Sequence, residues 1–255
     1  MNIKSHILIV IHNEFDRTND LINDLMSQDI KFNLTLVDND SSDQGLFKLY
    51  DRLNELEYVN IIKNNFNKPL NHIWNDFYES TTEEYLVYLN NDIRIPSNFL
   101  SDNEHIFNNH LDVGSVIHST NNPNYFNLTK NEYVILDEAW QGWDFAIRRD
   151  CYDLIPVELK WYSGDTFIFD NLIKKHKKKI AISLSSPILH HTSTTGRKKN
   201  INGILSKPDN KKRLDLGHAS PARNNSKYTN VPRPSDDVIN KWKLNYETFS
   251  NNIHL

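Results

Sequence analysis

An uninterrupted apolar stretch followed by three polar residues constrains this chain more than any other feature. Residues 85–89 read Tyr-Leu-Val-Tyr-Leu, which is typical of a strand buried on both faces of a sheet. Asn90, Asn91 and Asp92 follow directly. Open α/β sheets bind their ligands beyond the carboxyl ends of the strands, so we expect a binding site here, and Asp92 offers a hard oxygen to Mn²⁺ or Mg²⁺. A simple polar turn is the alternative.

Three similar units precede this strand. Residues 7–11, 32–37 and 59–62 are short apolar runs, and each ends in a polar cluster. Segments with helical periodicity separate them, and the first is expected to be capped by Thr18 and to end at Met26. The resulting β-α-β-α-β-α-β order predicts an α/β fold with a mostly parallel sheet, helices on both faces and a ligand crevice along the strand ends.

The second half of the chain is less regular. We expect helices at 99–111, near 150–155 and from about 166, and strands at 113–118, 139–147 and 180–184. Beyond residue 193, Asn, Lys, Pro and Ser dominate and periodicity fades. The sequence therefore predicts one folded domain over residues 1–193 and a basic, partly irregular extension over residues 194–255.

Composition excludes several classes of protein. The chain has 255 residues and a single cysteine, Cys151, which argues against a disulfide framework and fits a reducing, cytoplasmic location. No run reaches the roughly 18 apolar residues that a membrane span needs. With only 7 glycines, the sequence contains neither Gly-x-Gly-x-x-Gly nor Gly-x-x-x-x-Gly-Lys, the loops of dinucleotide-binding and P-loop proteins.

The charge is unevenly distributed along the chain. The net charge is −4, yet residues 174–255 carry 17 Lys and Arg against 5 Asp and Glu, a net +12, which leaves −16 for the rest. A basic segment of this kind attracts polyanions, although a solvated lysine-rich surface explains it equally well.

Six short motifs follow one another in a specific order. They are Leu-Val-Asp-Asn-Asp-Ser-Ser-Asp at 36–43, Asn-Phe-Asn at 65–67 with Asn75 downstream, Leu-Asn-Asn-Asp at 89–92, Trp-Gln-Gly and Ile-Arg-Arg at 140–142 and 147–149, Gly-Asp at 164–165, and His-His at 190–191. Together they resemble the motifs of family-two-type glycosyltransferases with the GT-A fold, over roughly residues 7–193. Each motif alone is weak, and the order carries the resemblance.

The resemblance implies metal-dependent, inverting transfer of a hexosyl or pentosyl group from a nucleotide-diphosphate sugar, with a UDP-sugar as the expected donor. It implies that Asp38 reads the uracil or ribose edge, that Asp92 and a late histidine hold Mn²⁺ or Mg²⁺, and that Asp165 deprotonates the acceptor hydroxyl. Adjacent strand residues point to opposite sides, so at most one of His190 and His191 is expected to be a ligand. The remaining expected site residues are His12, Asn13, Asn39, Asp40, Asn67, Asn75, Asn90 and Asn91 beside the donor, and Trp140, Gly142, Trp143 and Trp161 beside the acceptor.

Some residues depart from the family pattern, and other functions remain open. Gly164 stands where the family has Glu, Asp38 and Asp165 are also good helix caps, and Asp144 and Glu138 are the next candidates for the base. A nucleotidyltransferase would need a glycine- and lysine-rich loop after the first strand, which is missing. A nucleic-acid-binding protein without transferase activity would explain the basic segment but not the acidic motifs. A polyanionic acceptor, such as modified DNA or an anionic glycan, would account for both.

Overall fold

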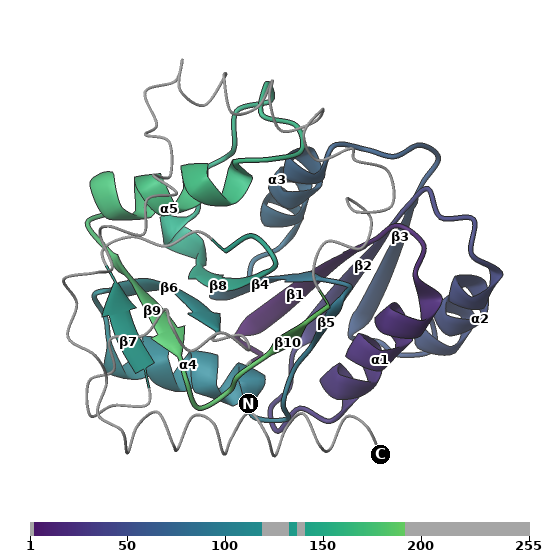
Figure 1. Ribbon diagram of the computed structural model, residues 1–255, viewed down its shortest axis with the longest axis horizontal. Helices are drawn as coiled ribbons and strands as arrows, with labels where there is room; N and C mark the ends of the chain where they lie inside the picture. Colours follow the sequence, from purple (N-terminus) through teal and green to yellow (C-terminus); the bar gives the residue numbers. More distant parts are fainter. Residues whose placement is uncertain (1–2, 119–132, 137–140, 192–255) are drawn as a thin grey trace.

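The computed structural model describes residues 3–118, 133–136 and 141–191, with only the backbone for 133–136. Its main strands are β1 (Ser5–Ile11), β2 (Asn33–Asn39), β3 (Val59–Asn64), β4 (Tyr85–Asn90), β6 (Val113–His118), β7 (Tyr133–Leu136), β8 (Asp144–Arg148) and β9 (Lys179–Ser183). They form one eight-stranded sheet in the order β3-β2-β1-β4-β8-β6-β9-β7 (Figure 1). Two further short strands, β5 (Ile93–Arg94) and β10 (Leu189–His190), pair antiparallel in a separate ribbon.

The first half of the sheet is parallel, as the sequence predicts. β1 pairs with both β2 and β4, and β2 with β3, all parallel. β8 runs antiparallel to β4 and β6, β9 is parallel to β6, and β7 closes the edge antiparallel to β9. The predicted α/β fold with a mostly parallel sheet is therefore confirmed, and the carboxyl ends of β1, β2, β3 and β4 lie along one edge.

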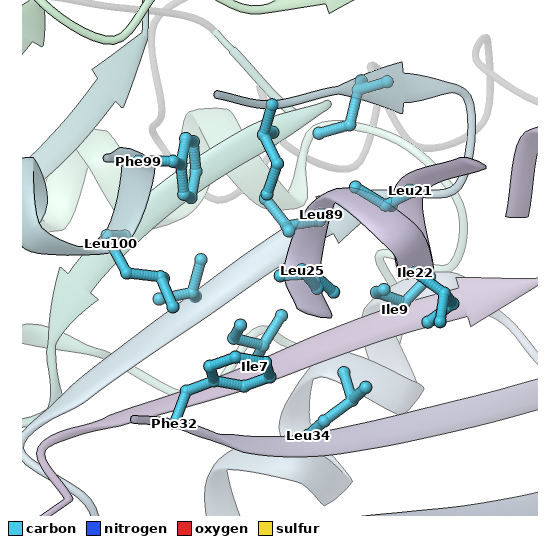
Figure 2. Close-up of a cluster of buried hydrophobic side chains, with 14 of the residues drawn as sticks. Ile7, Ile9, Leu21, Ile22, Leu25, Phe32, Leu34, Leu89, Phe99 and Leu100 are labelled. Carbon is cyan, nitrogen blue, oxygen red and sulfur yellow. The ribbon is translucent and has the colours of Figure 1, made fainter. Parts of the chain in front are cut away.

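Two helical layers cover the sheet (Figure 1). The helices are α1 (Phe15–Met26), α2 (Gln44–Leu53), α3 (Leu70–Ser80), α4 (Phe99–Asn109) and α5 (Gly164–Lys174). Alternate residues of β4 enter opposite layers. Val87 belongs to the core that residues of α1, α2 and α4 share, whereas Tyr88 belongs to the core that residues of α3 and α5 share. Figure 2 shows the first of these cores, where Ile7 and Ile9 of β1 meet Leu21, Ile22 and Leu25 of α1. The unbroken apolar run of β4 thus reflects burial on both faces.

Several predicted elements differ from the structure. α1 begins at Phe15, so Thr18 is not its cap; Glu14, with φ 65°, precedes the helix, and the Thr18 hydroxyl donates to the Glu14 carbonyl oxygen at 3.0 Å. Of the strand predicted at 139–147, residues 139 and 140 lie outside the described residues, 141–143 are not in a strand, and β8 begins at Asp144. The helix predicted near 150–155 is a single 3₁₀ turn at Arg149–Cys151, because Asn75 of α3 binds the following backbone instead.

No helix in the described part of the chain is long and apolar enough to cross a membrane. The predicted extension over residues 194–255 lies outside the described residues, so the proposed domain boundary remains a prediction.

Candidate active site

Asn39, at the end of β2, organises the loop that follows β3. Its amide nitrogen donates to Asn67 Oδ1 at 2.7 Å and to the Lys68 carbonyl oxygen at 2.9 Å. Its amide oxygen accepts from Asn64 Nδ2 and from the Lys68 backbone N–H, both at 2.9 Å. Asn39 is 3 % exposed and its amide is fully used, so it shapes the site rather than offering free groups to a ligand.

The loops after β1 and β2 are joined by a second set of bonds. His12 Nδ1 donates to the Asn39 carbonyl oxygen at 2.9 Å, and the Asn13 backbone N–H donates to Ser41 Oγ at 2.8 Å. Asn13, Glu14 and the exposed Asp40 all have positive φ, between 63° and 69°. Non-glycine residues in this region are strained and concentrate at functional sites.

Asp38 lies in the same corner and is 3 % exposed. It does not cap α2; the carboxylate of Asp43 does so, accepting from the Gly45 N–H. Asp38 Oδ1 instead accepts from the Ser41 N–H at 2.9 Å. Burial, together with the negative charge of Asp38, raises the pKa of Tyr50, so the phenol beside this carboxylate stays protonated at neutral pH.

β4 ends at Asn90, and Asn91 and Asp92 follow it at the same edge. Asn91 Nδ2 donates to Thr18 Oγ1 at 3.0 Å and to the Asn13 carbonyl oxygen at 3.3 Å, and the Asn90 N–H donates to the Trp143 carbonyl oxygen at 2.9 Å. Asp92 Oδ1 is buried and accepts no hydrogen bond. A buried carboxylate oxygen without a donor is costly unless a cation comes to it.

His190 supplies the nearest basic group to that oxygen. Its Nε2 lies 3.5 Å from Asp92 Oδ1, and its ring stacks on Trp143 with centroids 5.0 Å apart. The β5–β10 ribbon fixes this approach, because His190 pairs with Ile93 and the His191 N–H donates to the Asp92 carbonyl oxygen at 2.9 Å. The structure thus brings the predicted metal residues Asp92 and His190 together.

His191 has a different environment. Partial burial lowers the pKa of its imidazole, and the guanidinium groups of Arg17 and Arg94 lower it further, against the opposing charges of Asp92 and Asp20. The side chain is exposed, and its backbone, rather than its ring, makes the hydrogen bond with Asp92. This geometry favours His190 over His191 as the ligand.

Asp92 and His190 fit a divalent cation as part of its ligand set. A carboxylate oxygen that accepts no hydrogen bond and an imidazole nitrogen 3.5 Å away are suitable donors for Mn²⁺. The described residues contain no group of three or more His, Cys, Asp or Glu arranged to hold a metal. A cation here would therefore complete its shell with water and ligand oxygens, as Mg²⁺ and Mn²⁺ commonly do at phosphate sites.

Asp165 lies in the first turn of α5, where Ser163 rather than Asp165 occupies the cap position. Gly142 lies against it: a Cβ at Gly142 would be 3.2 Å from Asp165 Oδ2. Trp143 follows Gly142 in the chain and stacks on His190, which in turn faces Asp92. Asp165 is therefore linked to the Asp92 region by way of residues 142–143 and His190. The structure places the predicted base and the predicted metal ligands at one edge of the molecule.

Asn71 was not predicted as a site residue, yet it fixes the approach to Asp165. It is 1 % exposed, and its Nδ2 donates to the carbonyl oxygens of Leu159 at 3.2 Å and Tyr162 at 3.1 Å. A Cβ at Gly164 would lie 2.3 Å from Asn71 Oδ1. Glycine therefore replaces the expected Glu because the Asn71 amide occupies that space. Only the sequence departure at Gly164 signals this contact.

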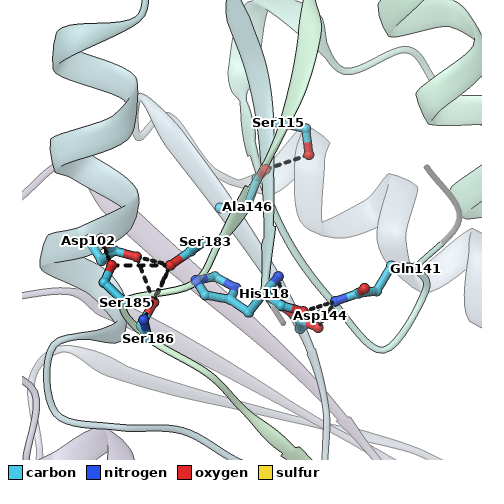
Figure 3. A network of polar contacts seen from close by, with 9 residues as sticks. All are labelled: Asp102, Ser115, His118, Gln141, Asp144, Ala146, Ser183, Ser185 and Ser186. Atoms are coloured by element: carbon cyan, nitrogen blue, oxygen red, sulfur yellow. Dashed lines mark hydrogen bonds and ion pairs between the residues drawn. The ribbon is translucent and has the colours of Figure 1, made fainter. Parts of the chain in front are cut away.

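A buried polar network supports the strands behind this edge (Figure 3). Asp144 is fully buried and accepts from His118 Nδ1 at 2.7 Å and from Gln141. Asp102 of α4 accepts from three hydroxyls of the segment leading to β10, those of Ser183, Ser185 and Ser186. Asp144 is thus committed to His118 and cannot reach an acceptor, which removes it as the alternative base; Glu138 lies outside the described residues.

The other predicted residues differ in what the structure shows of them. Asn67 is exposed and is hydrogen-bonded to Asn39. Both ends of the Asn75 amide bind the 152–155 segment, so Asn75 supports that loop. Trp143 packs on His190, and Trp161 is partly exposed just before α5. Trp140 lies outside the described residues.

Comparisons with known proteins support the fold. No protein-family model and no curated protein sequence matches the chain. Among solved structures, S. aureus TarS 1–349 in complex with UDP-GlcNAc is 12% identical with a TM-score of 0.63, covering 97% of this chain and 73% of that one. The mannosyltransferase PcManGT from Pyrobaculum calidifontis, with GDP-Man and Mn²⁺, is 13% identical with a TM-score of 0.61 and covers 97% and 73%.

GalNAc-T7 with UDP, GalNAc and Mn²⁺ is 13% identical with a TM-score of 0.62; the match covers 99% of this chain and 56% of GalNAc-T7. At these identities the likeness shows the fold alone. That fold is the GT-A fold expected from the sequence motifs.

Proposed function

We propose that this chain is a metal-dependent glycosyltransferase that uses a nucleotide-diphosphate sugar. The observation that carries the proposal is the buried Asp92 Oδ1, which accepts no hydrogen bond and faces His190 Nε2, at the strand edge that also holds Asp38 and Asn39. The GT-A neighbours are solved with UDP-GlcNAc, GDP-Man or UDP, two of them with Mn²⁺. A UDP-sugar remains the expected donor.

Each group has a distinct role in the proposed reaction. Asp38 binds the nucleoside, with Asp40, His12 and Asn13 forming the adjacent loops. Asp92 and His190 hold a divalent cation, which when bound neutralises the diphosphate and acts as a Lewis acid. In this proposal side chains and a cation bind the diphosphate, because the sequence lacks a glycine-rich phosphate-binding loop.

Asp165 serves as the general base of an inverting transfer. It takes the proton of the acceptor hydroxyl as that oxygen bonds to the anomeric carbon, while the bond from that carbon to the phosphate oxygen breaks. Gly142 leaves room beside the carboxylate, because a side chain there would approach Asp165 Oδ2 to 3.2 Å at its Cβ. Trp161 and Trp143 stand nearby as aromatic surfaces for the acceptor sugar. A polyanionic acceptor remains a prediction, because most of the basic segment lies outside the described residues.

Donor binding tests the proposal directly. Calorimetry with UDP-, TDP- and GDP-sugars and Mn²⁺ should identify one preferred nucleotide for the wild-type chain. EDTA or Asp92→Ala should reduce that affinity strongly, because the diphosphate then faces a site without its neutralising cation. Asp51→Ala serves as the matched control, since it removes an exposed aspartate of α2 and leaves the Asp92 carboxylate in place. Binding that is indifferent to EDTA, or no binding of any nucleotide sugar, would reject this function.

A further inference from the structure

Arg17 carries a buried polar atom that the fold does not satisfy. It lies in the first turn of α1, immediately beyond the β1 loop, and its Nη1 is buried without a hydrogen-bond partner. Arg94 of β5 shows the ordinary arrangement, with Nε and Nη2 donating to Asp24 at 2.7 and 2.8 Å. A buried donor on a charged group is costly when unpaired. Burying Arg17 Nη1 therefore costs free energy that no hydrogen bond within the described residues offsets.

The position of Arg17 relates it to the candidate metal site. The next residue, Thr18, accepts a hydrogen bond from Asn91 Nδ2 at 3.0 Å, which places this turn of α1 beside the end of β4. Asp92 follows Asn91 directly in the chain, and Arg17 directly precedes Thr18. Arg17 and Asp92 therefore lie on two segments that this hydrogen bond holds side by side.

These two segments carry two buried atoms of opposite character that lack a hydrogen bond. Arg17 Nη1 is a cationic donor without an acceptor, and Asp92 Oδ1 accepts no hydrogen bond and has only the His190 imidazole, 3.5 Å away, beside it. A metal-bound phosphate supplies what each atom lacks: the cation for the carboxylate and phosphate oxygens for the guanidinium. Arginine also suits phosphate because its planar fork donates two parallel hydrogen bonds.

We propose that Arg17 binds the diphosphate of the nucleotide donor, opposite the cation held by Asp92. The inference rests on the proposed function and adds a residue to its donor site. In the transfer, the bond between the anomeric carbon and the diphosphate oxygen breaks, and both bonding electrons stay on that oxygen. Arg17 stabilises this charge through its N–H groups without giving up a proton, because guanidinium remains protonated at working pH.

The test compares the nucleoside diphosphate with its nucleoside. Binding of UDP and uridine, with GDP and guanosine in parallel, is measured by calorimetry with Mn²⁺ for wild type, Arg17→Gln, Arg17→Lys and the control Arg52→Gln. Arg52 contacts Asn19 on the exposed side of α2 and serves as a matched arginine. Arg17→Gln should weaken diphosphate binding about ten- to hundredfold, the range for a hydrogen bond to a charged group, while nucleoside binding stays within about twofold.

Stability separates a binding role from a structural one. Removing a guanidinium whose buried Nη1 has no hydrogen-bond partner should leave the melting temperature of the free protein unchanged or raise it, whereas loss of a structural arginine would lower it. Arg17→Lys should recover part of the diphosphate affinity, because charge returns without the fork. Equal affinity of Arg17→Gln and wild type for the diphosphate overturns the inference, as does parallel loss of nucleoside binding. A wild type that binds no diphosphate refutes the proposed function itself.

Discussion

The contact between Gly164 and Asn71 makes a strong and specific prediction about stability. A methyl group at residue 164 would lie 2.3 Å from Asn71 Oδ1, 2.8 Å from its Cγ and 3.1 Å from its Nδ2. The Asn71 side chain cannot simply turn away, because its Nδ2 donates to the carbonyl oxygens of Leu159 and Tyr162. Gly164→Ala must therefore either displace the loop before Asp165 or break these two bonds.

The cost follows from the contacts that would be lost. Overpacking in a buried region lowers the free energy of unfolding by about 1–3 kcal/mol. Alanine is more favourable than glycine in a helix, which offsets at most about 1 kcal/mol of this loss. We expect Gly164→Ala to destabilise the chain by about 1–2 kcal/mol, the middle of the overpacking range less this offset. Asn71→Ala leaves two loop carbonyls without their donor and should cost about 1–3 kcal/mol. In the double variant the methyl fits the space vacated by the amide, so the total should fall short of the sum by about 1–2 kcal/mol.

Urea unfolding of the four proteins measures this coupling. Gly45→Ala provides the control, because a Cβ there would meet the Phe15 ring at 2.6 Å in the opposite helical layer. Gly45→Ala should therefore be destabilising and additive with Asn71→Ala. If Gly164→Ala and Asn71→Ala are also additive to within about 0.5 kcal/mol, the contact does not explain why residue 164 is glycine.

Two further predictions concern Asp165 and Glu83. Asp165→Asn should retain nucleotide-sugar binding but reduce transfer by at least about 10²-fold, measured as nucleotide release with acceptor, and near-normal turnover would exclude it as the base. Burial would raise the pKa of Glu83, but hydrogen bonds from Asn33 and His6 outweigh it and lower this pKa to about 2. Because the folded pKa is depressed, the stability from Glu83 is present above the unfolded value of 4.5 and is lost as pH falls towards 2. In wild type the free energy of unfolding should fall as the pH is lowered through this range, and in Glu83→Gln it should fall by less. The difference should be roughly 3 kcal/mol at most, and smaller to the extent that solvent screens the carboxylate. An unchanged acid limb would contradict this assignment.

The sequence predicts the first half of the fold well because its signals are local. Apolar runs such as that of β4 are long enough to identify buried strands, and a parallel order follows from the helices between them. The carboxyl ends of such strands share an edge, so clusters such as those at Asp38 and Asp92 are expected to meet there. The structure places both at that edge.

The parts that could not be predicted depend on contacts between distant segments. β5 and β10 have two residues each and pair only across the ribbon, so neither has a periodic signal. Thr18 has the sequence character of a cap, but its hydroxyl bonds with the Glu14 carbonyl oxygen and with Asn91. The helix begins instead at Phe15, directly after Glu14 with its positive φ. A capping propensity describes only which local hydrogen bonds a residue can make. Here the hydrogen bonds of Thr18 with Glu14 and Asn91 determine its role instead.

The asparagines explain how the site is built with so few glycines. Asn39, Asn71 and Asn75 each use a side-chain amide to bind backbone groups of a loop that is distant in sequence. An amide offers both donors and acceptors, so one buried side chain can replace a turn that would otherwise need glycine geometry. The loops are thereby held from neighbouring elements rather than by their own conformation. Asp92 Oδ1 and Arg17 Nη1 differ from these amides, because both are among the buried side-chain atoms of the described residues that have no hydrogen-bond partner.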